Sequence, residues 1–283
     1  MAGSDSSLTV FICTRNRPVE LASALQSIEA GSLRPARVVV SDDSNDTDAS
    51  ATLEVASRYG ADYQRGPRRG LGANRNACVA NLTTPLCAFI DDDVKVSRDF
   101  VQRASMAPVG QITTGWELNF SHRPPRAVQA SNSSFLGFQK VSTHRRLKSI
   151  VINATVIPAR IFQSAQFDEL TRYGYEELDF ARHAYSLGWQ IVFDPHLWVE
   201  HHPSSLGRSD HHDQRDQSRL YLTRYAYATY EKNILKALVF HRVAVLHLLL
   251  SGLRRGRGVR KSLTVAKNAQ ELYALRQARK VST

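Results

Sequence analysis

Acidic side chains in this sequence come directly after short apolar runs. Asp42 and Asp43 follow the β-branched run 37–41, and the triplet Asp91–Asp93 follows the apolar run 86–90. A single Asp after a strand is usually the N-cap of the next helix. Three consecutive acids exceed what one cap needs, and their repulsion is usually relieved by a bound cation. We therefore expect the triplet to lie at a cation site.

A second acidic group, formed by Glu176, Glu177 and Asp179, opens a segment with helical spacing. Acids in a first turn stabilise the helix dipole, so capping alone explains them. Two adjacent histidines, His201 and His202, end a later apolar segment. A lone His after a strand is usually structural, so neither group by itself identifies a reaction.

Apolar runs and helical spacings alternate in the first hundred residues. We predict strands over residues 8–13, 37–41, 62–64 and 86–90, and helices over residues 19–30, 49–59 and 70–81. Apolar strands that alternate with helices are typical of a parallel sheet covered on both faces. Ligands of such sheets bind beyond the carboxyl ends of the strands. The polar segment Thr14–Arg17, the pair Asp42-Asp43 and the triplet are therefore expected at one edge.

The pattern is weaker in the second part of the chain. We predict strands over residues 149–157 and 189–193, a turn at Asp194-Pro195, and helices over residues 161–167 and 176–187. Trp116 and Trp198 are expected to be pocket or core residues. The segment 115–150 contains no motif that indicates a chemistry.

In this order the motifs resemble glycosyltransferase family 2, whose members have the nucleotide-diphospho-sugar transferase (GT-A) fold. The matching residues are Thr14–Pro18, Asp42–Ser44, Gly70–Asn76, Phe89–Asp93, Glu176–Asp179, Gly188-Trp189, Asp194-Pro195 and His201. The resemblance covers roughly residues 8–202. It implies an α/β fold with a Rossmann-like, mostly parallel sheet flanked by helices.

The resemblance also implies a reaction. Such an enzyme transfers a sugar, with inversion at the anomeric carbon, from a nucleoside-diphosphate donor such as a UDP-, dTDP- or GDP-sugar. The acceptor is a hydroxyl group of a saccharide, of a lipid-linked (polyprenyl-linked) molecule or of a small molecule. A Mn²⁺ or Mg²⁺ ion neutralises the charge that the leaving diphosphate gains.

By this resemblance, Asp91 and Asp93 form a DxD-type motif. Asp93 is the expected direct metal ligand, and Asp91 is expected on the metal or on the ribose. His201 is the expected third protein ligand, because its separation of 24 residues from Glu177 resembles that in galactofuranosyl-transferring relatives. His202 is the alternative.

The resemblance assigns the catalytic base to the second member of the acidic pair, which is Glu177. Relatives usually carry Asp at this position, and Glu is one methylene longer, so Glu176 and Asp179 remain alternatives. A single base that faces a metal-held leaving group suits one in-line displacement without a covalent intermediate.

The implied donor-binding residues are Thr14, Asn16, Asp43, Arg75, Asp91 and Asp92. Asp43 is expected to hydrogen-bond the nucleobase, whereas Asp42 and Asp46 are expected to cap the next helix. Arg75 is expected to reach the diphosphate or to hold the triplet, and a solvated helix face is the alternative. The sequence Gly70-Leu71-Gly72 lacks the third glycine of a dinucleotide-binding fingerprint.

Two other functions remain open at this point. A sugar-nucleotide nucleotidyltransferase shares the fold, but such enzymes usually have a glycine-rich phosphate loop after the first strand, and Thr14–Pro18 contains no glycine. A non-enzymatic membrane adaptor would carry its function in the C-terminal region.

The formal charge of +11 is confined to the end of the chain. Residues 232–283 contain twelve basic residues and one acid, so residues 1–231 are neutral overall. We expect a GT-A domain over residues 1–215 and a basic helical extension over residues 216–283, with helices at 217–250 and 262–280. The extension has no interleaved stacking aromatics and no recognisable nucleic-acid-binding module, so no nucleic-acid partner is expected.

The extension combines an apolar stretch, residues 234–250, with a basic cluster, residues 254–261. Polar residues interrupt the apolar stretch at Lys236, His241, Arg242 and His247. They argue against a transmembrane helix, because charges are costly in a bilayer. An apolar segment beside basic residues is typical of binding to an anionic inner leaflet. A helical cap packed on the catalytic domain is the alternative.

The remaining features indicate the compartment. Cys13, Cys78 and Cys87 have apolar neighbours and no metal-type spacing, so we expect buried free thiols in a reducing compartment. Met1–Ser7 has no apolar run, so no signal peptide is expected. The expected location is the cytoplasm, with peripheral binding at the inner face of the plasma membrane. Asp210–Asp213 is expected to be a mobile loop near the donor site rather than a second metal site.

Overall fold

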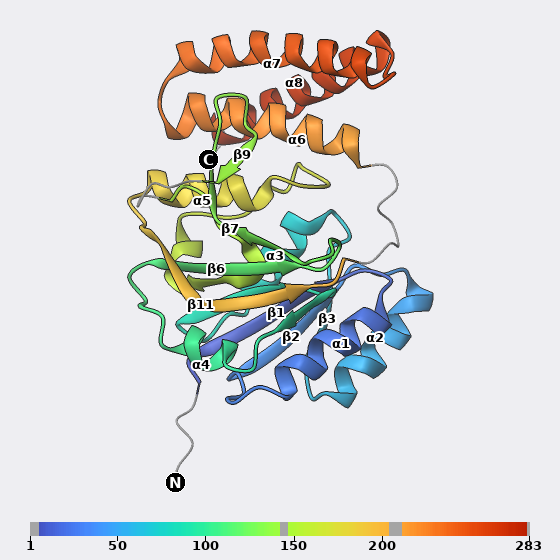
Figure 1. Cartoon of the computed structure of the whole chain (residues 1–283), viewed down its shortest axis with the longest axis vertical. Helices are drawn as coiled ribbons and strands as arrows, with labels where there is room; N and C mark the ends of the chain where they lie inside the picture. Colours follow the sequence, from blue (N-terminus) through green and yellow to red (C-terminus); the bar gives the residue numbers. More distant parts are fainter. Residues whose placement is uncertain (1–5, 142–146, 204–210, 282–283) are drawn as a thin grey trace.

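The computed structural model describes residues 6–141, 147–203 and 211–281. Figure 1 shows a central sheet with helices on both faces and, beyond one of these faces, a separate layer of C-terminal helices. This α/β architecture is the predicted fold class. Residues 1–5, on which the signal-peptide expectation largely depends, lie outside the described residues.

The N-terminal half of the sheet is parallel, as predicted. Strands β1 (Leu8–Thr14), β2 (Arg37–Asp42), β3 (Asp62–Arg65) and β4 (Leu86–Asp91) lie in the order β3-β2-β1-β4. They alternate with helices α1 (Pro18–Glu29), α2 (Asp46–Arg58) and α3 (Leu71–Val79). The register pairs Thr14 with Asp42 and Cys13 with Asp91. The acidic clusters after β2 and β4 therefore meet at one edge, beside the end of β1.

The other half of the sheet is mixed. It continues from β4 through β10 (Thr155–Pro158), β6 (Ile112–Asn119), β11 (Ile191–His201) and β5 (Val94–Val96), with β7 (Arg126–Gln129) beside β6. β10 is antiparallel to β4 and β6, and β5 is antiparallel to β11, whereas β6 and β11 are parallel. The register pairs His201 with Val94, and this brings the end of β11 next to the aspartate triplet.

Three predicted elements differ from those observed. The strand expected over residues 149–157 begins only at Thr155, because Ile152–Ala154 forms a 3-10 turn that directs the Asn153 side chain to Asp91. The helix expected over residues 161–167 is a 3-10 helix over Ala159–Gln163. The turn expected at Asp194-Pro195 is an irregularity within β11.

Two hydrophobic cores cover the opposite faces of the sheet. Val10 and Ile12 of β1 pack in the core that contains α1, α2 and α4 (Phe100–Ser105). Phe11, one position along the strand, packs in the core that contains α3 and α5 (Glu176–Ser186). This alternation is the two-residue period of a strand buried on both faces. All three cysteines are buried and free, as expected from the sequence.

The C-terminal layer consists of α6 (His212–Tyr225), α7 (Ile234–Arg254) and α8 (Val259–Val281), and it has a hydrophobic core of its own (Figure 1). The single helix expected over residues 217–250 is wrong. A π-helical turn, Ala226–Tyr230, follows α6, and Asn233 then caps α7 with its side chain. The hairpin of β8 (Ser131–Ser133) and β9 (Gln139–Val141) reaches this layer, and Phe135 stacks on Tyr227.

Helix α7 has one buried and one exposed face. Ala237, Phe240, Ala244 and Leu248 of α7 lie in the C-terminal core. Among the described helices, α7 is the one that is long and apolar enough to cross a membrane, judged by length and composition, and 22% of its most apolar stretch is buried. The face that is not buried is largely apolar: it exposes Ile234, Leu235, Leu238, Val239, Val243, Leu246, Leu250 and Leu253.

Candidate active site

The aspartate triplet leaves β4 at the edge where β1 and β2 also end. Asp91 is the last residue of β4, and Asp92 and Asp93 form the turn into β5. The Asp92 carboxylate is buried and accepts hydrogen bonds from Thr14 Oγ1 (2.8 Å) and Arg17 Nη1 (3.1 Å). Burial raises the pKa of Asp92 to about 6, although both donors oppose this rise. Thr14 and Arg17 thus hold the turn that presents Asp91 and Asp93.

Asp91 lies between an arginine and an asparagine. Arg75 Nη2 donates to its Oδ1 (3.2 Å), and Asn153 Nδ2 donates to its Oδ2 (3.2 Å). Arg75 is 1% exposed, so the alternative of a solvated helix face is wrong. The Nη1 atom of Arg75 donates to Glu176 at the start of α5 (3.1 Å). Arg75 therefore holds the triplet and joins it to the second acidic group.

Asp93 and His201 are in direct contact. His201 Nε2 lies 3.2 Å from Asp93 Oδ1, and His201 Nδ1 lies 2.7 Å from Glu117 Oε1 on β6. Burial opposes protonation of His201, but the hydrogen bonds to Asp93 and Glu117 outweigh burial and raise its pKa to about 10. The ring of His202 instead stacks on Phe120, with 4.5 Å between ring centroids. Of the two histidines, His201 is therefore the one that lies at the triplet.

The three expected metal ligands lie at one edge without forming a closed cluster. Within residues 6–141, 147–203 and 211–281, no group of three or more His, Cys, Asp or Glu side chains is arranged to hold a metal ion. Asp93 and His201 adjoin each other, whereas Asp91 is bonded to Arg75 and Asn153. A carboxylate beside an imidazole is a donor set that suits Mn²⁺ once the imidazole has given up its proton, because only a neutral ring nitrogen can bind the ion. The pair Asp93–His201 is thus the part of the expected set that fits such an ion.

The three acids at the start of α5 have different surroundings. Glu176 is buried against Arg75 (3.1 Å), and Asp179 is buried against Arg276 of α8 (2.9 Å). Glu177 lies between them in the sequence and has no ion pair or hydrogen bond with a described residue. Burial and the neighbouring Glu176 carboxylate raise the pKa of Glu177 to about 8, while Arg75 opposes the rise. Glu177 is therefore the acid of this group that is free to accept a proton.

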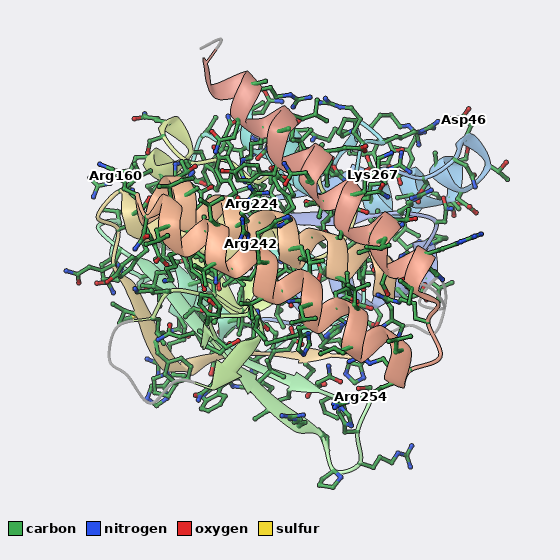
Figure 2. The ribbon with its side chains drawn as sticks, turned by 90° about the horizontal axis from the view of Figure 1, so that it is seen from above. Asp46, Arg160, Arg224, Arg242, Arg254 and Lys267 are labelled. Carbon is green, nitrogen blue, oxygen red and sulfur yellow. The ribbon has the colours of Figure 1, made fainter. Side chains whose placement is uncertain are left out.

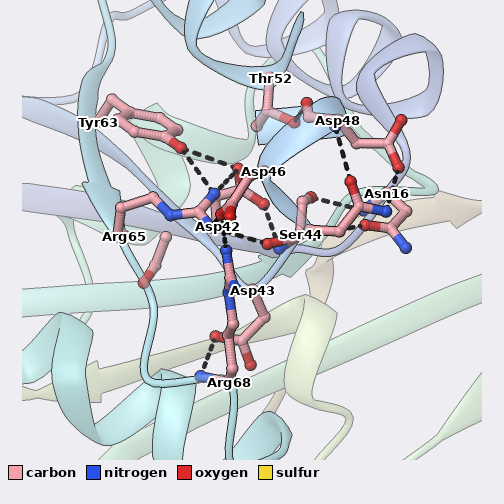
Figure 3. Close-up of polar contacts among 12 residues, drawn as sticks. Asn16, Asp42, Asp43, Ser44, Asp46, Asp48, Thr52, Tyr63, Arg65 and Arg68 are labelled. Carbon is pink, nitrogen blue, oxygen red and sulfur yellow. Dashed lines mark hydrogen bonds and ion pairs between the residues drawn. The ribbon is translucent and has the colours of Figure 1, made fainter. Parts of the chain in front are cut away.

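The acids after β2 belong to a polar network that Figure 3 shows. The N-cap of α2 is Asn45, whose side chain accepts from Asp48 N, so the expected capping by Asp42 and Asp46 is wrong. Asp42 is fully buried, and it accepts from Tyr63 OH (2.9 Å) and Arg65 Nη1 (3.3 Å). Its other oxygen, Oδ1, accepts from the backbone N–H of Ser44 (2.8 Å), so neither oxygen of Asp42 caps α2.

Asp43 points to the loop after β3 (Figure 3). Its Oδ1 accepts from the backbone N–H of Arg68 (2.9 Å), and burial raises its pKa to about 6. Asn16 has a positive φ of 57°, and its side-chain oxygen accepts from the backbone N–H of Asn45 (3.0 Å). These contacts join the loops after β1, β2 and β3. The donor-binding roles of Thr14, Asn16 and Asp43 stay predictions.

The expected mobile loop near the donor site is wrong for His212 and Asp213, because α6 begins at His212. His211 stacks on Tyr173 with 4.2 Å between ring centroids. Asp213 forms an ion pair with Arg257 (2.6 Å). Asp210, the other member of that stretch, lies outside the described residues.

Two residues of the site are not recognisable from the sequence. Glu117 contacts His201, and Asn153 donates from one amide nitrogen to Glu117 (3.1 Å) and to Asp91 (3.2 Å). Glu117 lies in a segment without a motif, and Asn153 lies in a run predicted as a strand. In the sequence, each of them stands out only as a polar residue among apolar neighbours. Such a residue, when buried, needs a hydrogen-bond partner.

Comparison with known proteins gives a family match that includes this edge of the sheet. Residues 9–105, which run from β1 past the aspartate triplet, match the model of the family described as "Glycosyl transferase family 2". The chain is 27% identical over 223 residues to the succinoglycan biosynthesis protein ExoM of Rhizobium meliloti (strain 1021). This match covers 71% of the chain and 68% of ExoM.

Solved structures with a similar fold are glycosyltransferases. GalNAc-T7, determined with UDP, GalNAc and Mn²⁺, has a TM-score of 0.63 at 14% identity, over 81% of this chain. The chain spans about half of that structure (49%). The mannosyltransferase PcManGT from Pyrobaculum calidifontis, determined with GDP-Man and Mn²⁺, has a TM-score of 0.57 at 13% identity, over 96% of this chain and 88% of that one. These likenesses establish the GT-A fold.

Proposed function

We propose a specific reaction for this chain, which is a glycosyltransferase of family 2 with the GT-A fold. It transfers a sugar from a nucleoside-diphosphate donor to a hydroxyl group, with inversion at the anomeric carbon and with dependence on Mn²⁺ or Mg²⁺. A donor of this class is supported by the UDP and GDP-Man ligands of the two similar structures. The acceptor is a saccharide, a polyprenyl-linked molecule or a small molecule.

The position of Arg75 carries this proposal. One guanidinium group donates both to Asp91 of the triplet (3.2 Å) and to Glu176 at the start of α5 (3.1 Å). The helix that bears Glu177 is thereby held against the edge where strand-end ligands of such sheets bind. Asp91 and Glu117 are close enough to add to the raised pKa of Glu177. This arrangement supports a proton acceptor on one side of the donor and a metal on the other.

Each residue then has a role in a single displacement. Glu177 accepts the proton of the acceptor hydroxyl as its oxygen attacks the anomeric carbon. Asp93 and His201, together with Asp91, would hold the metal ion, with Glu117 orienting the imidazole through Nδ1. When bound, the ion supplies positive charge that neutralises the leaving diphosphate. No nucleophile of the protein is needed, so the product has the inverted configuration.

Two substitutions test the assignment. A panel of UDP-, dTDP- and GDP-sugars, with and without Mn²⁺, first identifies the donor by the rise in melting temperature that a native-state ligand causes. Nucleoside diphosphate release is then measured for Asp93→Asn and Glu177→Gln, with Glu54→Gln on the exposed surface of α2 as control. We expect turnover to fall ~100-fold or more in both variants and to stay unchanged in the control. Wild-type turnover in both would overturn the assignment, and pyrophosphate release would indicate a nucleotidyltransferase.

The C-terminal extension, residues 216–283, is proposed to bind an anionic membrane surface. The exposed face of α7 presents Leu238 and Leu246, and α7 contains no acidic residue. Figure 2 looks onto this layer and shows α7 and α8 across it, with Arg242 and Arg254 labelled. Apolar side chains beside basic ones suit the boundary between headgroups and acyl chains. Peripheral binding is favoured over a span, because the opposite face of α7 already packs in the protein core.

Vesicle flotation tests this part of the proposal. We expect the protein to float with vesicles that contain phosphatidylglycerol and to remain unbound with phosphatidylcholine alone. Leu238→Glu and Leu246→Glu should reduce the bound fraction, whereas Leu53→Glu, an exposed leucine on α2, should not. Flotation that does not depend on these leucines would refute α7 as the membrane-binding face. Binding would support the peripheral membrane location that we propose.

A further inference from the structure

The side chain of Arg276 on α8 contacts α5, the helix that carries Glu177. Its Nη2 lies 2.9 Å from Oδ2 of Asp179 on α5, and its Nη1 lies 3.3 Å from Oδ2 of Asp168. Its guanidinium carbon lies 3.9 Å from the centroid of the Tyr225 ring. The side chains of Asp179 and Asp168 are 0% and 3% exposed, so both ion pairs are buried. A buried carboxylate without its partner is costly, so these contacts are specific constraints on α5.

Asp168 fixes the loop that leads into α5. Its Oδ1 accepts from the backbone N–H groups of Leu170 and Thr171 (both 3.0 Å), and its Oδ2 accepts from Tyr221 OH (2.7 Å). The loop ends at Tyr175, which has a φ of +71° and is the residue directly before the start of α5. By holding Asp168 and Asp179 together, Arg276 fixes both ends of the segment that contains this bend.

The first turn of α5 is thus held from two sides by two arginines. Arg75 of α3 forms an ion pair with Glu176, and Arg276 of α8 in the C-terminal layer forms an ion pair with Asp179. Glu177 lies between these two residues and has no partner of its own among the described residues. Its direction therefore depends on how its two neighbours are held, and a shift of about 1 Å in a catalytic group can cost ~100-fold in rate.

We propose that Arg276 is a positioning residue for the catalytic base, so that the C-terminal layer takes part in the transfer reaction. This rests on the proposed function, in which Glu177 is that base. The C-terminal layer then has two roles. Helix α7 binds the membrane surface, and α8 positions the side chain of the catalytic base. The basic residues of the chain end are accordingly of two kinds, exposed ones such as Lys267 and the largely buried Arg276.

A double-mutant cycle on the full chain tests the proposal. Donor hydrolysis, with water as acceptor, is measured for Arg276→Ala, Glu177→Gln and the double variant. We expect Arg276→Ala to lower kcat ~10- to ~100-fold with the donor KM changed less than ~2-fold. In the Glu177→Gln background the same change should have no further effect, because the group that Arg276 positions is already gone. Arg276→Lys should restore part of the rate, since it keeps the charge but not the two-sided geometry.

The controls separate this role from general stability. Lys267→Ala removes a basic residue from an exposed site on the same helix and should leave kcat and KM unchanged. If Arg276→Ala does not fold, Asp179→Asn removes the same ion pair from the other side without changing its size. Wild-type kcat in the folded variant, or an equal loss in both Glu177 backgrounds, would overturn the proposal. A wild-type rate in Glu177→Gln alone would instead refute the base assignment.

Discussion

His201 Nε2 lies 3.2 Å from Asp93 Oδ1, although the two residues come from strands that are far apart in the sequence. The pairing of β11 with β5 produces this contact, because it places His201 opposite Val94, the residue after Asp93. His202, the next residue, turns away to Phe120. The two histidines therefore form a matched pair for testing the metal site.

We expect His201→Ala to weaken Mn²⁺ binding and His202→Ala to leave it unchanged. If His201 is one of the three proposed protein ligands, removing it should raise the Mn²⁺ concentration for half-maximal turnover by about 10-fold or more. Mutation of a residue that only supports a metal ligand already lowers metal affinity by about 10-fold or more. Turnover is measured as a function of Mn²⁺ after treatment with a chelator. Equal effects of the two substitutions would contradict the assignment of His201.

Turnover should rise with pH as Glu177 loses its proton. The pKa of Glu177 is raised to about 8 by burial and by the carboxylates of Glu176, Asp91 and Glu117, while Arg75 opposes the rise. A base acts only when it is deprotonated, so the rate should increase from pH 6 to pH 8 and level off only well above pH 8. The pH profile of kcat/KM shows this limb, and Glu177→Gln should lack it. A rate that is independent of pH between 6 and 8 would contradict a base with this pKa.

Arg75→Met should destabilise the protein strongly. The change leaves the buried Glu176 carboxylate and the Asp91 carboxylate without their shared partner. Breaking a buried ion pair on one side costs about 3–5 kcal/mol in the free energy of unfolding. Urea unfolding measures this cost. Arg58→Ala breaks the exposed pair with Glu54 on α2 and should cost less than about 0.5 kcal/mol.

Gly72→Ala should disturb the loop before α5. A Cβ atom on Gly72 would lie 2.1 Å from the backbone oxygen of Asp168, so the loop or α3 must move. Overpacking of this kind costs about 1–3 kcal/mol. Gly258→Ala is the control, because a Cβ atom there has no neighbour within 4 Å. Thermal unfolding compares the two variants, and equal melting temperatures would show that this close approach does not constrain the loop.

Local patterns in the sequence were sufficient to predict the polar edge of the sheet. The apolar runs of β1, β2 and β4 and the acids at their ends predict a parallel sheet with a polar edge, because burial on both faces and strand polarity act over a few residues. The order of the motifs also predicted the match of residues 9–105 to the family 2 model and the GT-A fold. The predictions for Asn153 and Asp42 were wrong. The side chain of each hydrogen-bonds a residue of another segment, and no local pattern in the sequence identifies such a partner.

The division of roles among similar residues depended on the tertiary structure. The sequence placed Glu177 first as the base and left Glu176 and Asp179 as alternatives. In the structure, long-range ion pairs bind Glu176 to Arg75 and Asp179 to Arg276, which distinguishes the surroundings of these two acids from those of Glu177. The excess of positive charge at the chain end was evident from composition. Only the contacts of its side chain with Asp168 and Asp179 distinguish the largely buried Arg276 from its solvated neighbours, because burial and partners are properties of contacts between distant segments and not of residue type.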